Sequence, residues 1–123
     1  MTDTNSFYQY VLPLRAVTHN LYYRIYKGKY HISNVGKKYR TSVKNAFKKY
    51  KNIFCFKKTQ KLKVDILYYL KKNYRIDLDN LNKGLVDACK DILYEDDSAI
   101  FELNCKKFLD QENDQIIINI KEL

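Results

Sequence analysis

The segment from residue 77 to 97 spaces its carboxylates and one lysine in a way that suits phosphate chemistry. Asp77 and Asp79 are two residues apart where the chain leaves a strand, and in extended geometry their carboxylates would point the same way. Lys83 follows one helical turn after Asp79, and Asp87 follows one turn after Lys83. Clustered carboxylate oxygens are hard ligands that suit Mg²⁺ or Mn²⁺. The pattern predicts metal-assisted cleavage of a phosphodiester.

A second acidic pair, Asp96 and Asp97, follows the predicted helix, where the chain turns back towards the same edge of a sheet. We therefore expect three or four carboxylates to converge with Lys83, whose charge would offset the negative charge that builds up on a phosphate. A simpler interpretation stays open. In it Asp79 only caps a helix, Lys83 only forms an ion pair with Asp87, and the later pair are ordinary turn acids.

The acidic segment is placed by a strand before it and a helix within it. Residues 61–70 alternate apolar and polar side chains, which is the period of a half-buried strand. A helix is predicted from Asn80 to Leu93, with Asp79 as its N-cap. The helical spacing of its apolar residues predicts a buried face made of Leu81, Leu85, Ala88, Cys89 and Ile92.

The remaining elements complete a small sheet and add one more helix. Residues 18–33 are rich in Tyr and cations with a turn at Gly28, and they fit either a short hairpin or an ordered loop. Apolar residues at helical spacing predict a helix from Gly36 to Lys51. Three further strands are predicted, at residues 7–14, 99–108 and 115–120.

This order of elements predicts the fold class. The 123 residues suffice for one domain that buries a core without disulfides or metals, so we expect a single domain over residues 1–123. The order β-α-β-α-β-β predicts an α+β fold with two layers, a small mixed sheet carrying two helices.

Charge is divided along the chain. Residues 1–76 hold 18 Lys and Arg against two acids, a net charge of +16, whereas residues 77–123 hold five against twelve, a net charge of −7. A basic surface joined to an acidic site suggests a nucleic-acid partner, although a solvated face would show the same row of cations. The residues expected to contact the nucleic acid are Arg24, Lys27, Lys29, Lys37, Lys38, Arg40, Lys44, Lys48 and Arg75.

Tyrosines are interleaved with these cations in the predicted hairpin or loop. Such rings can stack on unpaired bases, but they can equally pack against the sheet with their hydroxyls outward. No role is assigned to His19 or His31. The four tyrosines concerned are Tyr22, Tyr23, Tyr26 and Tyr30.

The composition predicts an intracellular protein, cytoplasmic or associated with the nucleoid. No apolar run is long enough to span a bilayer, and we expect no membrane partner. Cys55, Cys89 and Cys105 lack the paired short spacings of zinc or disulfide sites, so we expect reduced, buried thiols. The heavy use of Lys, Asn, Ile and Tyr is typical of an AT-rich genome, such as that of a virus or a mobile element.

The stretch "DLDNLNKGLVDA" followed by "LYEDD" resembles the signature of the RusA family of Holliday junction resolvases. The resemblance covers nearly the whole chain and begins at "LPLRAVTHNLYYRIYKGKYHISNVGKKYR". Its core pattern is D-x-D-N-x-x-K, with a pair of aspartates after the helix. The chain departs from the family in carrying a single proline after its first strand and in placing Ile76, where an Arg is common, directly before Asp77.

The resemblance implies roles for individual residues. Asp77, Asp79 and Asp97 would be metal ligands for Mg²⁺, with Mn²⁺ as a substitute, and Lys83 would be the catalytic lysine. Asn80 would lie near the site. Asp87 would orient Lys83, and Asp96 would be the less favoured ligand of its pair.

The resemblance also implies a function. The chain would be a Mg²⁺-dependent, structure-selective endodeoxyribonuclease that resolves four-way junctions by paired symmetric nicks in DNA recombination and repair. One chain supplies one carboxylate cluster, and two symmetric nicks need two, so we expect a homodimer.

Three alternatives stay open. A nuclease of the same fold would cut flaps or other branched DNA. A catalytically silent protein would only bind junctions or other nucleic acid, although such a protein gains nothing from carboxylates facing phosphates. A basic RNA-binding or ribosome-associated protein would explain the Lys and Tyr content but not the acidic cluster.

Overall fold

The computed structural model describes residues 7–72 and 76–123 and confirms the α+β class. The main sheet has the strand order β1-β6-β4-β5, and a separate two-stranded hairpin pairs β2 with β3. The strands are β1 (Tyr8–Leu12), β2 (Tyr23–Tyr26), β3 (Lys29–Ile32), β4 (Leu62–Tyr69), β5 (Ile100–Phe108) and β6 (Gln115–Glu122). The helices are α1 (His19–Tyr22), α2 (Asn34–Phe47) and α3 (Asp79–Ala88), with a 3₁₀ turn at Asp97–Ala99.

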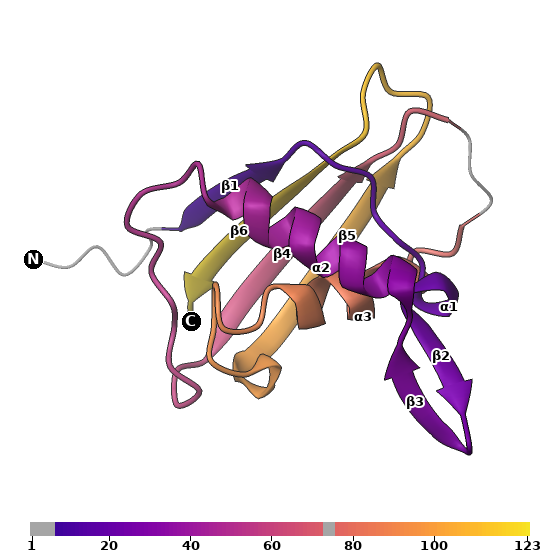
Figure 1. Ribbon diagram of the computed structural model, residues 1–123. Coiled ribbons are helices and arrows are strands. Elements are labelled where there is room, and N and C mark those ends of the chain that lie inside the picture. Colours follow the sequence, from indigo (N-terminus) through magenta and orange to yellow (C-terminus); the bar gives the residue numbers. More distant parts are fainter. Residues whose placement is uncertain (1–6, 73–75) are drawn as a thin grey trace, which may run out of the picture.

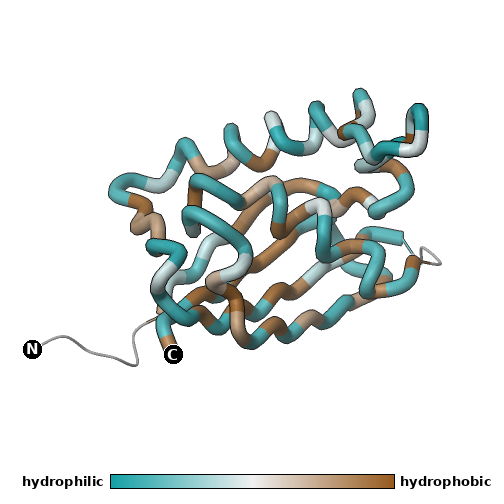
Figure 2. The backbone as a smooth tube through the Cα atoms, turned by 90° about the horizontal axis from the view of Figure 1, so that it is seen from below, coloured by the Kyte–Doolittle hydropathy of each residue, from teal (hydrophilic) through white to brown (hydrophobic). Residues whose placement is uncertain are grey.

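The main sheet is mixed, as expected. β6 runs antiparallel to both β1 and β4, while β4 and β5 are parallel. Both α2 and α3 lie over one face of this sheet, and the view in Figure 2 shows the helices and the strands as two layers. The other face of the sheet has no helix of the described chain over it (Figure 1).

The core lies between these layers and follows from the alternating pattern of the strands. Leu62, Val64 and Ile66 of β4 are buried, and their registered partners on β6 are buried as well. α2 meets them with an apolar stripe, because residues three and four apart share one side of a helix. That stripe consists of Gly36, Tyr39, Val43 and Phe47.

Several predicted boundaries were wrong by a few residues. β1 ends at Leu12, α2 lies at Asn34–Phe47 rather than Gly36–Lys51, and α3 ends at Ala88 because a turn follows it. In that turn Asp91 has a left-handed φ of 68°, which the interior of a helix does not allow. Among the described residues the cysteines are free, as expected, but only Cys89 is buried, whereas Cys55 is exposed.

The segment that the sequence left undecided is a hairpin. It projects away from the sheet (Figure 1). Its two-residue turn has positive φ at Lys27 (51°) and Gly28 (74°), which is the conformation favoured between twisted strands.

The base of the hairpin is held between two helices by Tyr22, which is fully buried. A methyl group at Gly84 of α3 would come within 3.0 Å of the Tyr22 ring, and one at Gly36 of α2 would overlap the Tyr22 carbonyl oxygen. The buried hydroxyl of Ser33 caps α2 by accepting from the Gly36 N–H (3.0 Å), and it donates to the carbonyl oxygen of Leu21. The hairpin, α2 and α3 are therefore locked together at one point.

No helix in the part of the chain that the structure describes has the length and apolar character to cross a membrane.

Candidate active site

Two buried tyrosines hold the acidic helix α3 in place, Tyr68 from the sheet and Tyr94 from the segment that follows the helix. The hydroxyl of Tyr68 on β4 donates a hydrogen bond shared between the carbonyl oxygen of Leu81 (3.0 Å) and Oδ1 of Asn82 (2.8 Å). The hydroxyl of Tyr94 donates to the carbonyl oxygen of Val86 (2.6 Å). These bonds fix the rotation of α3, so that Asn82 faces Tyr68 while Asp79 and Lys83 are exposed.

The first two aspartates lie at the start of α3, on backbone that is not extended. Leu78 has helical angles (φ −57°, ψ −40°), and the Asp77 carbonyl oxygen accepts from the Asn80 N–H (3.0 Å). The expectation of extended geometry was therefore wrong, since the turn that opens α3 already includes Leu78, between the two aspartates. Asp79 was also wrong as the N-cap, because Leu78 holds that position and Asp79 is the first helical residue.

Both carboxylates remain accessible. Asp77 and Asp79 are exposed, and Asn80 beside them is half-buried. Among residues 7–72 and 76–123, no cation or hydrogen-bond donor pairs with either carboxylate. Two negative groups without a partner at a helix N-terminus are favoured by its dipole and remain free to take a cation.

Lys83 and Asp87 form the ion pair that their spacing predicts, with Nζ 3.7 Å from Oδ2. The Asp87 side chain is 29% exposed, and Lys83 is 59% exposed. Burial raises the pKa of the Asp87 carboxyl, and the negative charge of Asp97 raises it further, while Lys90 and His19 act in the opposite direction. Asp87 is thus within electrostatic reach of both Lys83 and Asp97.

Asp96 and Asp97 differ in their surroundings, because only Asp96 has a hydrogen-bond donor and a cation beside it in the described part of the chain. Asp96 accepts a hydrogen bond from the Ser98 hydroxyl (2.5 Å) and lies 3.5 Å from Lys90 Nζ. The bond from Ser98 lowers the pKa of Asp96. Asp97 begins the 3₁₀ turn, is exposed, and has no such partner in the described part of the chain. This contrast favours Asp97 over Asp96 as a ligand.

The acidic side chains that were expected to converge on one site come together only in part in this structure. Asp97 lies near Asp87, whereas the charge of Asp79 acts on Cys105 of β5. Within residues 7–72 and 76–123, no three acidic, His or Cys side chains are gathered closely enough to hold a metal ion.

Two residues near the site were missed by the sequence analysis. Asn82 accepts a hydrogen bond from Tyr68 (2.8 Å) and acts to lower the pKa of the Cys105 thiol, while His19 acts to lower the pKa of Asp87. His19 is far from α3 in sequence, so residue spacing could not predict that the two lie close together. For Asn82 the sequence indicated only a polar residue on a helix.

The basic residues form an exposed surface, as expected. Lys37, Arg40 and Lys44 point outward because the opposite side of α2 is buried. Arg75 lies outside the described residues. The other expected DNA contacts, Arg24, Lys27, Lys29, Lys38 and Lys48, are exposed as well.

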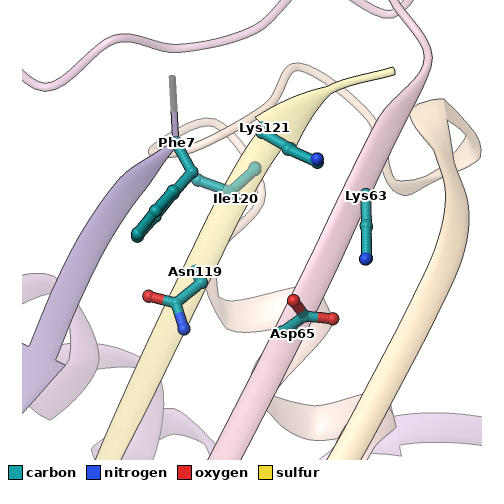
Figure 3. Close-up of a pocket in the computed structure, with 6 residues that line it drawn as sticks. All are labelled: Phe7, Lys63, Asp65, Asn119, Ile120 and Lys121. Carbon is teal, nitrogen blue, oxygen red and sulfur yellow. The ribbon is translucent and has the colours of Figure 1, made fainter. Parts of the chain in front are cut away.

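A separate hollow of about 150 Å³ lies on the side of the sheet away from the helices (Figure 3). Lys63 and Asp65 of β4 line it together with Asn119 and Lys121 of β6, and these residues alternate with the buried ones of the same strands. It contains no candidate active-site residue.

An exposed acidic helix beside a cationic helix, on a small α+β sheet, defines a compact domain with both an anionic centre and a surface for a polyanion. Comparison with known proteins gives the family. The sequence model of the endodeoxyribonuclease RusA family matches residues 13–121, and the chain belongs to this family. It is 33% identical, over 95 residues, to the crossover junction endodeoxyribonuclease RusA of Enterobacteria phage HK97, and the match covers 77% of each chain.

Proposed function

We propose that this protein is a Mg²⁺-dependent endonuclease that resolves four-way DNA junctions by paired symmetric nicks, in recombination and repair. The observation that carries the proposal is its membership of the RusA endodeoxyribonuclease family with the D-x-D-N-x-x-K residues at an exposed helix start. The relative from phage HK97 bears the name of a crossover junction endonuclease, which supports the same substrate and an origin in a virus or mobile element.

The donor chemistry of the site fits magnesium. Asp77, Asp79 and Asp97 offer hard oxygen ligands, and each is exposed without a protein cation on it in the described chain. We assign these three residues to hold the ion, with Asn80 and Asp96 supporting the site. When bound, Mg²⁺ would supply Lewis-acid stabilisation of the charge that develops on the scissile phosphate.

The roles of the lysine and its partner follow from the ion pair. Lys83 would place its ammonium group against a phosphate oxygen and stabilise negative charge there as the bond to the leaving oxygen breaks. Asp87, which is half-buried, would position Lys83 rather than touch the phosphate. The exposed cations of α2 and the hairpin would hold the junction arms through phosphates, so affinity should fall steeply with salt.

A homodimer would match this chemistry to the substrate. A junction with two-fold symmetry presents two equivalent strands, and two copies of the chain would present two equivalent sites. We therefore propose a homodimer that nicks one strand with each subunit.

The test is incubation of the purified protein with an end-labelled four-way junction and a matched linear duplex, each with Mg²⁺, Mn²⁺ or EDTA. The expected result is a pair of symmetric nicks in the junction alone, lost in EDTA. Tight binding without nicks would support a silent junction binder instead, and preferred cutting of flaps would keep the chemistry but change the substrate. Retention on RNA without cleavage of DNA would reject the proposal.

A further inference from the structure

Exposed apolar side chains gather on the hairpin and the short helix before it. Leu21 is 53% exposed, Ile25 67%, Tyr26 63% and Tyr30 67%. Such a concentration on an element that projects from the body, with cations around it, marks a surface that contacts another molecule.

Three rings on this segment form a cluster. The centroid of His19 lies 5.0 Å from that of Tyr23 and 6.2 Å from that of Tyr30, and the two tyrosines are 6.4 Å apart. The rings border a hollow of about 440 Å³ whose other lining residues are Asn20, Arg24 and Ile25. Aromatic faces are thus combined with the amide of Asn20 and the imidazole of His19, which can donate and accept hydrogen bonds.

The cluster is continuous with the candidate active site. Lys83 Nζ lies 5.8 Å from the centroid of Tyr23, and Tyr23 in turn packs against His19. Tyr22, the residue before Tyr23, is wedged against Gly84 of α3, so the hollow has a fixed position relative to Lys83.

We infer that this hollow takes an unpaired nucleobase adjacent to the phosphate that Lys83 contacts. The base would stack on the ring of Tyr30, and the Tyr23 ring, whose plane is nearly perpendicular to that of Tyr30, would meet the edge of the base. The inference rests on the proposed function and names a subsite of the same site. Flat aromatic faces beside a phosphate-binding lysine match the two parts of a nucleotide, its base and its phosphate. Junction centres offer unpaired or weakly stacked bases, so the subsite would help to distinguish a junction from continuous duplex.

The charges around the hollow favour a nucleotide over a second copy of the chain. Arg24, Lys27 and Lys29 are exposed on the hairpin, and Lys27 lies over the Tyr26 ring. Two such hairpins would repel one another, whereas a polyanion would be attracted to them.

The test uses fluorescence of 2-aminopurine, which is quenched when the base stacks on an aromatic ring. Junctions carrying 2-aminopurine at single positions around the crossover are titrated with the wild type, Tyr30→Ala and Tyr30→Phe in EDTA. Tyr26→Ala is the matched control, because Tyr26 is as exposed as Tyr30 but lies on the other face of the hairpin. Tyr30 is largely exposed, so its replacement should leave the fold intact.

We expect quenching near the crossover with wild type and Tyr30→Phe, and loss of it with Tyr30→Ala. Junction affinity should fall at least about fivefold in Tyr30→Ala, while duplex affinity and Tyr26→Ala stay near wild type. Any of three results would overturn the inference. They are an equal loss of junction affinity in Tyr26→Ala and Tyr30→Ala, no quenching at any position, and a change in oligomeric state in Tyr30→Ala.

This experiment needs neither metal nor cleavage, so its result is independent of whether the protein proves to be a nuclease. Stacking of a base without cleavage in the nuclease assay would reject the proposed function but support the base-binding subsite. Cleavage without stacking would support the proposed function and reject the subsite.

Discussion

At the scale of single residues, the acids of this site differ in what surrounds them. Asp96 is held by Ser98 and Lys90, and Asp87 is held by Lys83. Asp79 and Asp97 are exposed, and no protein cation of the described residues pairs with either. Acids without partners gain most from a bound cation, and on this ground we propose Asp79 and Asp97 as ligands and Asp87 and Asp96 as supporting residues.

Asp79→Asn should abolish metal-dependent cleavage while leaving the fold and the junction affinity intact. An amide cannot replace the charge of the carboxylate, and the side chain is exposed, so the cost to stability is limited to about 0.3–1 kcal/mol of helix-dipole interaction. Thermal unfolding, gel-shift binding and cleavage assays check the three parts.

The matched control for this variant is Asp91→Asn, which removes an exposed acid in the turn after α3. Asparagine also tolerates the left-handed backbone of that position. Normal cleavage by Asp79→Asn, or equal loss in the control, would remove Asp79 from the site.

Lys83→Ala should lower the cleavage rate by about 100-fold and change junction affinity little, because a group that stabilises developing charge acts mainly on the transition state. Single-turnover cleavage and equilibrium binding separate the two effects. Lys90→Ala is the control, since Lys90 is also exposed and paired with an acid, Asp96. Equal losses of rate and affinity in Lys83→Ala would make Lys83 a phosphate anchor instead.

At the scale of elements, the junction of the hairpin with α2 depends on one buried hydroxyl. Ser33 caps α2 and also bonds the backbone at Leu21, and its own N–H donates to the Tyr22 carbonyl oxygen (2.8 Å). The hairpin is therefore positioned by a contact with the helix that carries much of the basic surface.

Ser33→Ala should lower the free energy of unfolding by about 1–2 kcal/mol, because it removes the cap and the donor to the part-buried carbonyl group of Leu21. Chemical denaturation measures this change. In the control, Thr41→Ala, an exposed hydroxyl that bonds the Lys37 carbonyl oxygen (3.1 Å) is lost, and stability should change by less than about 0.5 kcal/mol. A similar small effect of Ser33→Ala would show that the cap is dispensable.

The cationic face of α2 should bind phosphates without regard to sequence. Replacing Lys44 and Lys48 by Gln should weaken binding to junction and duplex alike and reduce the slope of log K against log salt by roughly two. A control that replaces Lys106 and Lys121, on the far side of the sheet, should leave the slope unchanged. A larger change of slope in the Lys106 and Lys121 variant than in the Lys44 and Lys48 variant would indicate that DNA binds the other face of the sheet.

At the scale of the whole molecule, the proposed dimer predicts the number of nicks. When wild-type protein is mixed with an excess of Asp79→Asn carrying a size tag, purified mixed dimers should cut one strand of each junction and leave the second strand intact. Strand-specific labels count the nicks. Two nicks from mixed dimers, or a mass of one chain at all concentrations by sedimentation, would contradict the paired-subunit proposal.

The sequence by itself determined the α+β class, most elements and the pairing of Lys83 with Asp87. Strand alternation and helical spacing are local properties, and residues four apart in a helix meet whatever surrounds them. The buried faces of β4 and α3 were accordingly predicted almost residue by residue, Ile92 excepted, which is only half-buried.

Only the tertiary structure decided where the helices begin and end, how closely the acidic side chains approach one another, and which other residues contact them. Leu78 adopts helical angles and Ser98 engages Asp96, and neither follows from spacing. The hairpin of Tyr23 and Tyr30 reaches Lys83 because Tyr22 is wedged at Gly36 and Gly84, from two different helices. Contacts between distant segments depend on packing of the whole core, which periodicity along the chain does not encode.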